Sequence, residues 1–85
     1  MKIQLKFFAS LREAIGASAQ TLDVPAHVAT TGQLRDYLID QGAPYSAALA
    51  RGKAVRAALN QTVCDDSALL ADGAEVAFFP PVTGG

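Results

Sequence analysis

The chain has 85 residues, which is the size of one small domain. Its net charge is −1 and its seven Lys and Arg residues form no run, which argues against a nucleic-acid-binding protein. One Cys and one His exclude an internal disulfide and a cysteine-based zinc site. No apolar run approaches the ~20 residues that span a bilayer. Because the N-terminus also lacks the pattern of a secretory signal, we expect a cytoplasmic protein that binds neither membrane nor nucleic acid.

Two elements are predicted at the start of the chain. Residues 2–8 alternate between apolar and polar side chains, which predicts a strand with one buried face. A short helix should follow at once, because Ser10 can cap it and Glu13, three residues later, completes a capping box. Gly16 is a typical residue to end that helix.

The middle of the chain predicts a short strand over residues 20–24 and the main helix over about 31–41. Thr30 is expected to cap the main helix, with Gln33 at the reciprocal position of the capping box. An Ala-rich stretch over 44–51 then predicts a third, short helix.

The last third of the chain predicts three strands, over residues 53–60, 62–64 and 75–79. Turns are expected at residues 60–61 and 72–73. The order β-α-β-α-α-β-β-β indicates an α+β domain. The residues predicted to form its core are Leu5, Phe7, Leu34, Leu38, Leu59, Val76 and Phe78.

The chain ends in the sequence FPPVTGG, residues 79–85. Pro80 and Pro81 donate no N–H and favour extended backbone, so they cannot continue a sheet. Gly84 and Gly85 have no Cβ and therefore fit a narrow channel. The one unusual group is the carboxylate of Gly85, which is a poor electrophile until it is activated, typically by adenylation with ATP. Since the chain contains no phosphate-binding loop, another enzyme would have to activate it.

Three segments carry a family resemblance: FFASLREAIG at 7–16, ALNQT at 58–62 and DGAEVAFFPPVTGG at 72–85. Through them the whole chain resembles the small subunit of molybdopterin synthase, a MoaD-type sulfur carrier. The resemblance implies a ubiquitin-like β-grasp domain over residues 1–79, with a mixed twisted sheet and the main helix packed on one face. It also implies an extended tail over residues 80–85.

The resemblance further implies a sulfur-transfer cycle. An E1-like activating enzyme would consume ATP to adenylate Gly85, which is then converted to a thiocarboxylate. The large subunit would receive the tail and pass the sulfur to cyclic pyranopterin monophosphate during molybdenum cofactor biosynthesis. The chain itself would be a non-catalytic subunit without a bound cofactor or metal, and whether the two subunits form a heterotetramer stays open. The residues expected to insert with Gly85 are Pro80, Pro81, Val82, Thr83 and Gly84.

A partner-binding patch is expected beside the tail. Phe8 and Phe79 lie on the predicted outward faces of their strands, where either a helix covers them or a partner binds them. In the resembling family the positions of Phe8, Val63 and Phe79 contact the large subunit, and we favour this role. Cys64 has no His neighbour and is expected to be a small buried strand residue, while His27 is expected in a solvated loop.

Three other functions stay open. Sulfur carriers for thiamine or cysteine synthesis share the fold and the Gly-Gly end, although FFASLRE and FFPPVTGG favour the molybdopterin branch. A ubiquitin-like modifier would instead be joined through Gly85 to a lysine amine of a target protein. A plain interaction domain with an incidental tail would tolerate deletion of Gly85.

Overall fold

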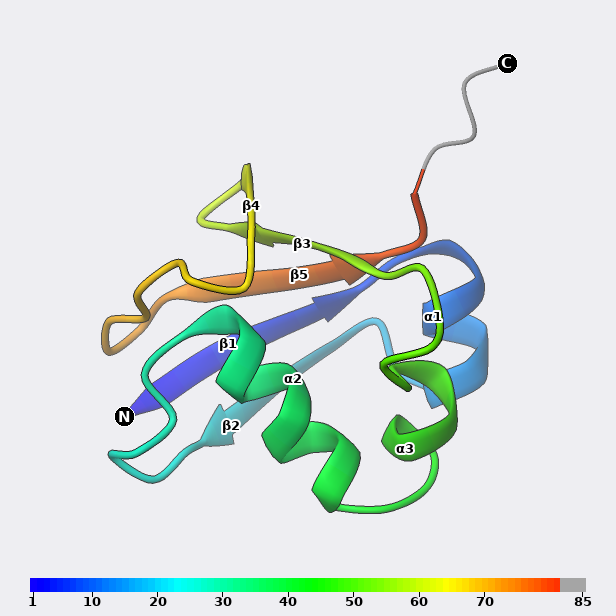
Figure 1. Cartoon of the computed structure of the whole chain (residues 1–85), viewed down its shortest axis with the longest axis horizontal. Coiled ribbons are helices and arrows are strands. Elements are labelled where there is room, and N and C mark those ends of the chain that lie inside the picture. Colours follow the sequence, from blue (N-terminus) through cyan, green and yellow to red (C-terminus); the bar gives the residue numbers. More distant parts are fainter. Residues whose placement is uncertain (82–85) are drawn as a thin grey trace.

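The computed structural model describes residues 1–81, and residues 82–85 lie outside the described part. Five strands and three helices follow one another in the predicted order (Figure 1). None of these helices is long and apolar enough to cross a membrane. The elements are β1 (Lys2–Phe7), α1 (Ala9–Ile15), β2 (Ala19–Asp23), α2 (Thr31–Asp40), α3 (Tyr45–Ala48), β3 (Arg56–Leu59), β4 (Thr62–Cys64) and β5 (Glu75–Phe79).

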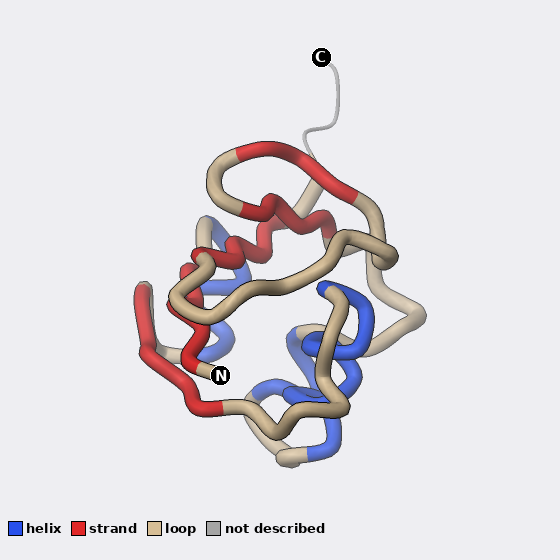
Figure 2. The backbone as a smooth tube through the Cα atoms, turned by 90° about the vertical axis from the view of Figure 1, so that its left-hand side faces the viewer, coloured by secondary structure: helices blue, strands red, loops and turns tan. Residues whose placement is uncertain are grey.

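The strands form one mixed sheet in the order β2-β1-β5-β3-β4. The first and last strands, β1 and β5, run parallel in the middle of the sheet, and the other pairs are antiparallel. Helices α2 and α3 lie on the same side of the sheet (Figures 1 and 2). The expected α+β arrangement, with a mixed sheet and the main helix on one face, is confirmed.

The core lies between the sheet and the helices. Phe7 stacks on Phe78 with ring centroids 6.3 Å apart, and Tyr45 of α3 lies equally close to Phe7. Six of the seven predicted core residues are almost fully buried. The exception is Leu59, which is only partly buried because β3 lies near one edge of the sheet with the three-residue β4 as its outer neighbour.

The predicted start of the first helix is wrong. Ser10 lies inside α1 rather than before it, and the N-cap residue is Phe8, whose side chain makes no capping hydrogen bond. The N–H of Phe8 instead donates to the carbonyl of Phe78 at 3.2 Å, so the sheet fixes where the strand turns into the helix. The predicted end is confirmed, because Gly16 is the C-cap in the left-handed region at φ 84°.

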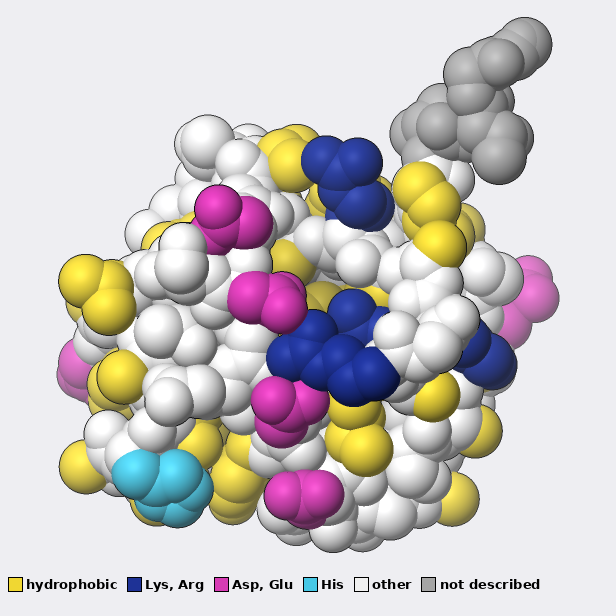
Figure 3. Space-filling view, in the orientation of Figure 1, with side chains coloured by type: hydrophobic (Ala, Val, Ile, Leu, Met, Phe, Trp, Pro, Cys, Tyr) yellow, Lys and Arg dark blue, Asp and Glu magenta, His cyan; other side chains and the backbone are white. Residues whose placement is uncertain are grey.

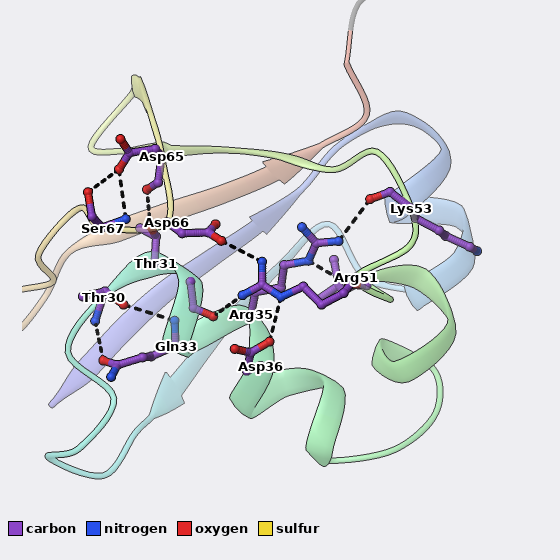
Figure 4. Close-up of polar contacts among 12 residues, drawn as sticks. Thr30, Thr31, Gln33, Arg35, Asp36, Arg51, Lys53, Asp65, Asp66 and Ser67 are labelled. Atoms are coloured by element: carbon purple, nitrogen blue, oxygen red, sulfur yellow. Dashed lines mark hydrogen bonds and ion pairs between the residues drawn. The ribbon is translucent and has the colours of Figure 1, made fainter.

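The main helix begins as predicted. The N–H of Gln33 donates to Thr30 Oγ1 at 3.2 Å, and Gln33 Oε1 accepts from the Thr30 N–H at 3.1 Å (Figure 4). This reciprocal pair is the expected capping box. The same Gln33 oxygen accepts from the N–H of Ala29 at 2.9 Å, so the box also fixes the residue before the cap.

The short third helix and the strand that follows it are both shorter than predicted. Helix α3 ends at Ala48 and strand β3 begins only at Arg56. The loop between them is held by Arg35 of α2, which is only 7% exposed. Its guanidinium donates to the carbonyl oxygens of Leu49 (2.7 Å), Ala50 (2.7 Å) and Lys53 (3.2 Å). These carbonyls are therefore satisfied without a helix or a strand.

Candidate functional site

The side of the sheet away from α2 and α3 carries the predicted patch. Because neighbouring strand residues point to opposite faces, the neighbours of the buried Phe7, Val76 and Phe78 point to this side. We call the following set the open face: Lys6, Phe8, Arg56, Ala58, Val63, Ala77 and Phe79.

Two alanines form the floor of the open face. Ala77 of β5 lies between Lys6 of β1 and Ala58 of β3, and Ala58 in turn lies opposite Val63 of β4. Both alanines are 7% exposed, whereas Val63 is 56% exposed. A shallow apolar row therefore crosses the three strands β5, β3 and β4, and its outer end is open to solvent.

Two aromatic side chains stand at one end of this row. Phe8 is 47% exposed, and its backbone bond to Phe78 places it beside the end of β5. Phe79 is half-buried and pairs with Arg56 of β3. The structure thus brings Phe8, Val63 and Phe79 onto one face, where partial exposure leaves them available to a partner. Their role in binding stays a prediction.

Charged groups border the open face on two sides. Lys6 Nζ lies 3.1 Å from Glu75 Oε1, so this ammonium group already has a partner. Arg56 has no ion pair within residues 1–81. The apolar strip is therefore bordered by a neutralised pair on one side and an available guanidinium on the other.

The tail leaves the sheet next to the aromatic end. Strand β5 ends at Phe79, and Pro80 and Pro81 are half-buried residues outside any strand. Since β5 is the central strand, the chain leaves from the middle of the sheet beside Phe8. Four of the predicted tail residues lie outside the described residues: Val82, Thr83, Gly84 and Gly85.

The remaining candidate side chains form no second reactive centre within residues 1–81. His27 is exposed in a loop, as predicted. Cys64 is half-buried rather than fully buried, with its Sγ 3.7 Å from the carbonyl of Ala57. Its exposure results from its place on β4, the last strand of the sheet. No group of three or more His, Cys, Asp or Glu in this part of the chain could hold a metal ion.

A polar cluster that the sequence did not suggest joins α2 to the loops around it (Figure 4). Arg51 donates at 2.8 Å to both Asp36 and Asp66, and the bond from Arg51 lowers the pKa of Asp36. Hydrogen bonds from Ser67 lower the pKa of Asp65. Burial, assisted by the nearby Arg51 charge, lowers the pKa of the Arg35 guanidinium, while the bond to Asp36 raises that of Arg51. The sequence offered one signal for this cluster: Arg35 directly follows Leu34, a residue of the apolar stripe of the main helix.

Comparison with known proteins identifies the family. Residues 5–85 match the ThiS family. The chain belongs to the ThiS family. The molybdopterin synthase sulfur carrier subunit of Escherichia coli (strain K12) is 45% identical over 83 residues, which cover 98% of this chain and 99% of that subunit.

Solved structures identify the fold. SAMP1 from Haloferax volcanii matches with a TM-score of 0.75 and 28% identity over the full length of both chains. The chain therefore has the ubiquitin-like β-grasp fold that the resemblance implied. A protein–protein complex of subunits 1 and 2 of the molybdopterin-converting factor from Helicobacter pylori also contains this fold, with a TM-score of 0.66 and 24% identity over the full length of both chains.

Proposed function

We propose that the chain is the sulfur carrier subunit of molybdopterin synthase and that Gly85 carries the sulfur. The observation that supports this most is the 45% identity to the subunit of that name from Escherichia coli, which extends over 98% of the chain. The match to the ThiS family reaches residue 85 and so includes the FFPPVTGG ending, on which the carrier chemistry depends.

The proposed cycle needs no reactive side chain on this subunit. The activating enzyme joins the Gly85 carboxylate to AMP, and ATP loses pyrophosphate. A sulfur donor then displaces AMP and leaves a thiocarboxylate, whose sulfur is a stronger nucleophile than a carboxylate oxygen. The sulfur then forms a C–S bond to a carbon of the pterin precursor and displaces an oxygen leaving group from it, and hydrolysis of the acyl–sulfur bond restores the Gly85 carboxylate. The acid–base groups for these steps are assigned to the partner enzymes, and since activation consumes ATP we place the cycle in the cytoplasm.

The open face is the proposed docking surface for both partners. Its apolar row and its aromatic end lie beside the point where the tail leaves β5, so a protein that binds this face also receives Pro80 and the residues after it. One tail must visit the active sites of the large subunit and of the activating enzyme in turn. The two partners therefore compete for Phe8, Val63 and Phe79.

A second candidate function is protein modification. The SAMP1 chains that share the fold are described as small archaeal modifier proteins, and a modifier would use the same activated Gly85. In a modifier, a lysine amine of the target protein would attack the activated Gly85, where in a carrier the sulfur donor attacks it. We favour the carrier because the match to the Escherichia coli subunit is closer than the 28% identity to SAMP1.

Intact-mass spectrometry separates these functions. The purified chain is incubated with ATP, sulfide and an activating enzyme of this family, and then with the large subunit and the pterin precursor. A carrier gains the mass difference between sulfur and oxygen and loses it again when molybdopterin forms. A chain that stays unchanged, or that is recovered only as Gly85 isopeptides on lysines, contradicts the proposal. A thiocarboxylate that forms but is not discharged by the pterin indicates a carrier for another pathway.

A further inference from the structure

Arg56 stands at the aromatic end of the open face. It is the first residue of β3 and lies directly opposite Phe79 of β5, so both side chains point away from α2 and α3. Ala58, two residues further along β3, belongs to the same face and forms part of its floor. Because Arg56 is exposed, its guanidinium lies in water next to both the aromatic edge and the apolar row.

Among residues 1–81, no carboxylate forms an ion pair with Arg56. Glu75, at the other end of β5, is 3.1 Å from the Nζ of Lys6. Asp65, which follows β4, accepts a hydrogen bond from the Ser67 N–H through its side chain and one from Thr31 through its carbonyl. The acidic groups nearest to the open face therefore have other partners.

The arginines on the helix side of the sheet have partners within the chain. Figure 3, which looks onto that side, shows acidic side chains next to Lys and Arg side chains in the middle of the face. Arg51 donates at 2.8 Å to both Asp36 and Asp66, and Arg35 donates to three loop carbonyls. Arg56 differs from both, because its charge is left for a group outside the described residues to neutralise.

A protein that covers Phe79 also removes water from Arg56, since the two side chains are cross-strand neighbours. A guanidinium that loses its water and gains no counter-charge weakens a complex. A carboxylate compensates for this loss, because its two oxygens can accept two parallel N–H bonds from one guanidinium. The phosphates of a nucleic acid also carry negative charge, but they would leave Ala58, Ala77 and Phe79 without an apolar partner.

We propose that the large subunit presents an Asp or Glu carboxylate to Arg56, beside an apolar pocket that receives Phe79. The inference rests on the function proposed above, because it names the chemistry of the partner that docks on the open face. Arg56 is then a specificity-determining residue, since a surface that is apolar or basic at this point binds less well even where it accepts Phe79. The pair also fixes the orientation in which the tail enters, because Phe79 directly precedes Pro80.

One substitution distinguishes a paired from an unpaired Arg56 by the direction of its effect. Arg56→Met keeps an unbranched side chain but removes the charge. If a carboxylate faces Arg56, the change leaves that carboxylate buried and unpaired, and binding to the large subunit should weaken about tenfold or more. If none does, the change removes a desolvation cost, and an equal or higher affinity would overturn the proposal. Isothermal titration calorimetry with the large subunit of the same organism measures the affinity.

Two further variants control for net charge. Arg56→Glu should weaken binding more than Arg56→Met does, because it sets two like charges against each other. Lys53→Gln removes an exposed cation outside the open face, and its affinity should stay within about twofold of that of the unaltered chain. A loss for Lys53→Gln as large as that for Arg56→Met would show that net charge rather than a paired carboxylate determines the affinity. Thermal unfolding curves check that each variant retains the fold.

The same titrations separate this inference from the proposed function. An unaltered chain that does not bind the large subunit would contradict both. Binding by the unaltered chain that Phe79→Ala weakens and Arg56→Met does not would contradict the paired carboxylate alone and leave the open face as the docking surface.

Zero-length cross-linking identifies the carboxylate. Arg56→Lys places an amine near the position of the guanidinium, and a water-soluble carbodiimide joins an amine to a carboxylate in contact with it. We expect peptide mass spectrometry of the complex to find an amide between position 56 and an Asp or Glu of the large subunit. A complex that forms but gives no cross-link from position 56, or one only to a second copy of this chain, would overturn the proposal.

Discussion

Ala58 of β3 lies directly opposite Ala77 of β5, and each is 7% exposed on the side of the sheet away from α2 and α3. Their methyl groups barely rise above the backbone, whereas Phe8 and Val63 beside them are about half exposed. The open face is therefore a shallow basin with raised apolar edges. Such a shape accepts a protruding apolar group of a partner while the edges exclude water.

The aromatic edge should supply much of the binding energy. Phe79→Ala is expected to weaken binding to the large subunit by about 1 kcal/mol or more, because a buried aromatic anchor is lost. Isothermal titration calorimetry measures the affinity, and an ¹⁵N spectrum checks that the fold is retained. Leu69→Ala is the control, since Leu69 is 75% exposed and lies outside the open face. Equal affinities of the Phe79 variant and the unaltered chain would remove this residue from the interface.

The end of the chain should tolerate no extension. One alanine added after Gly85 moves the reactive carboxylate beyond the point where attack is aligned, so sulfur transfer should stop. The assay is molybdopterin formation from a thiocarboxylated carrier and the large subunit. An unfolding curve like that of the original chain would show that the domain is intact. Normal turnover by an extended chain that has not been trimmed would rule out Gly85 as the residue that carries the sulfur.

The core should depend on the main helix. Leu38 is 1% exposed beneath the sheet, and Leu38→Ala is expected to lower the free energy of unfolding by about 2–5 kcal/mol. Urea unfolding followed by circular dichroism measures the change. The exposed Leu69→Ala should stay within about 0.5 kcal/mol of the original chain. A cost for Leu38→Ala as small as that of the control would mean that this side chain does not fill the core.

The two capping boxes predicted from the sequence should differ in their contribution to stability, because only the one at Thr30 forms. Thr30→Ala removes the side-chain oxygen that accepts from Gln33 and should cost about 1 kcal/mol of stability. Ser10→Ala should cost nothing measurable, because Ser10 lies inside α1 and makes no cap. Chemical unfolding of both variants compares them directly. A larger loss for Ser10 than for Thr30 would reverse the two assignments.

The pair formed by Asp36 and Arg51 should make stability depend on pH. The hydrogen bond from Arg51 lowers the pKa of Asp36 below the ordinary 3.8, so the folded chain releases this proton more readily than the unfolded chain. The stabilisation is therefore present above pH 3.8 and is lost as the pH falls through the lowered pKa. Asp36→Asn should be slightly less stable than the original chain at neutral pH, and the difference should vanish in acid. Urea unfolding over a pH series measures this, and a difference that persists unchanged in acid would contradict it.

The sequence predicted the elements whose signals are local. Thr30 and Gln33 sit at the spacing of a capping box, and the alternation in residues 2–7 follows the strand period, so both predictions hold. Ser10 and Glu13 have the same spacing but fail, because the bond between Phe8 and Phe78 fixes the helix start. That bond joins residues far apart in sequence and leaves no local trace.

The site was predictable to a similar extent. Alternation alone placed Phe8 and Phe79 on outward faces, and the family resemblance added Val63 to the expected patch. That the three residues share one face depends on the strand order β1-β5-β3-β4, which only the structure shows. The polar contacts of Arg35 and Arg51 were not predicted at all. Arg35 lies between apolar positions of α2, and the carbonyl groups that it binds come from residues 49–53. How this loop packs against α2 is visible only in the structure.

The parallel pairing of β1 and β5 sets how the domain responds to force. A pull applied at Lys2 and at Phe79 acts on opposite ends of two adjacent parallel strands. It loads all the hydrogen bonds of that ladder in shear at the same moment, whereas a pull that separates β3 from β4 at their open end breaks bonds one after another. Drawing the chain out by its C-terminal end, as an unfolding motor would, therefore meets the mechanically strongest part of the sheet first.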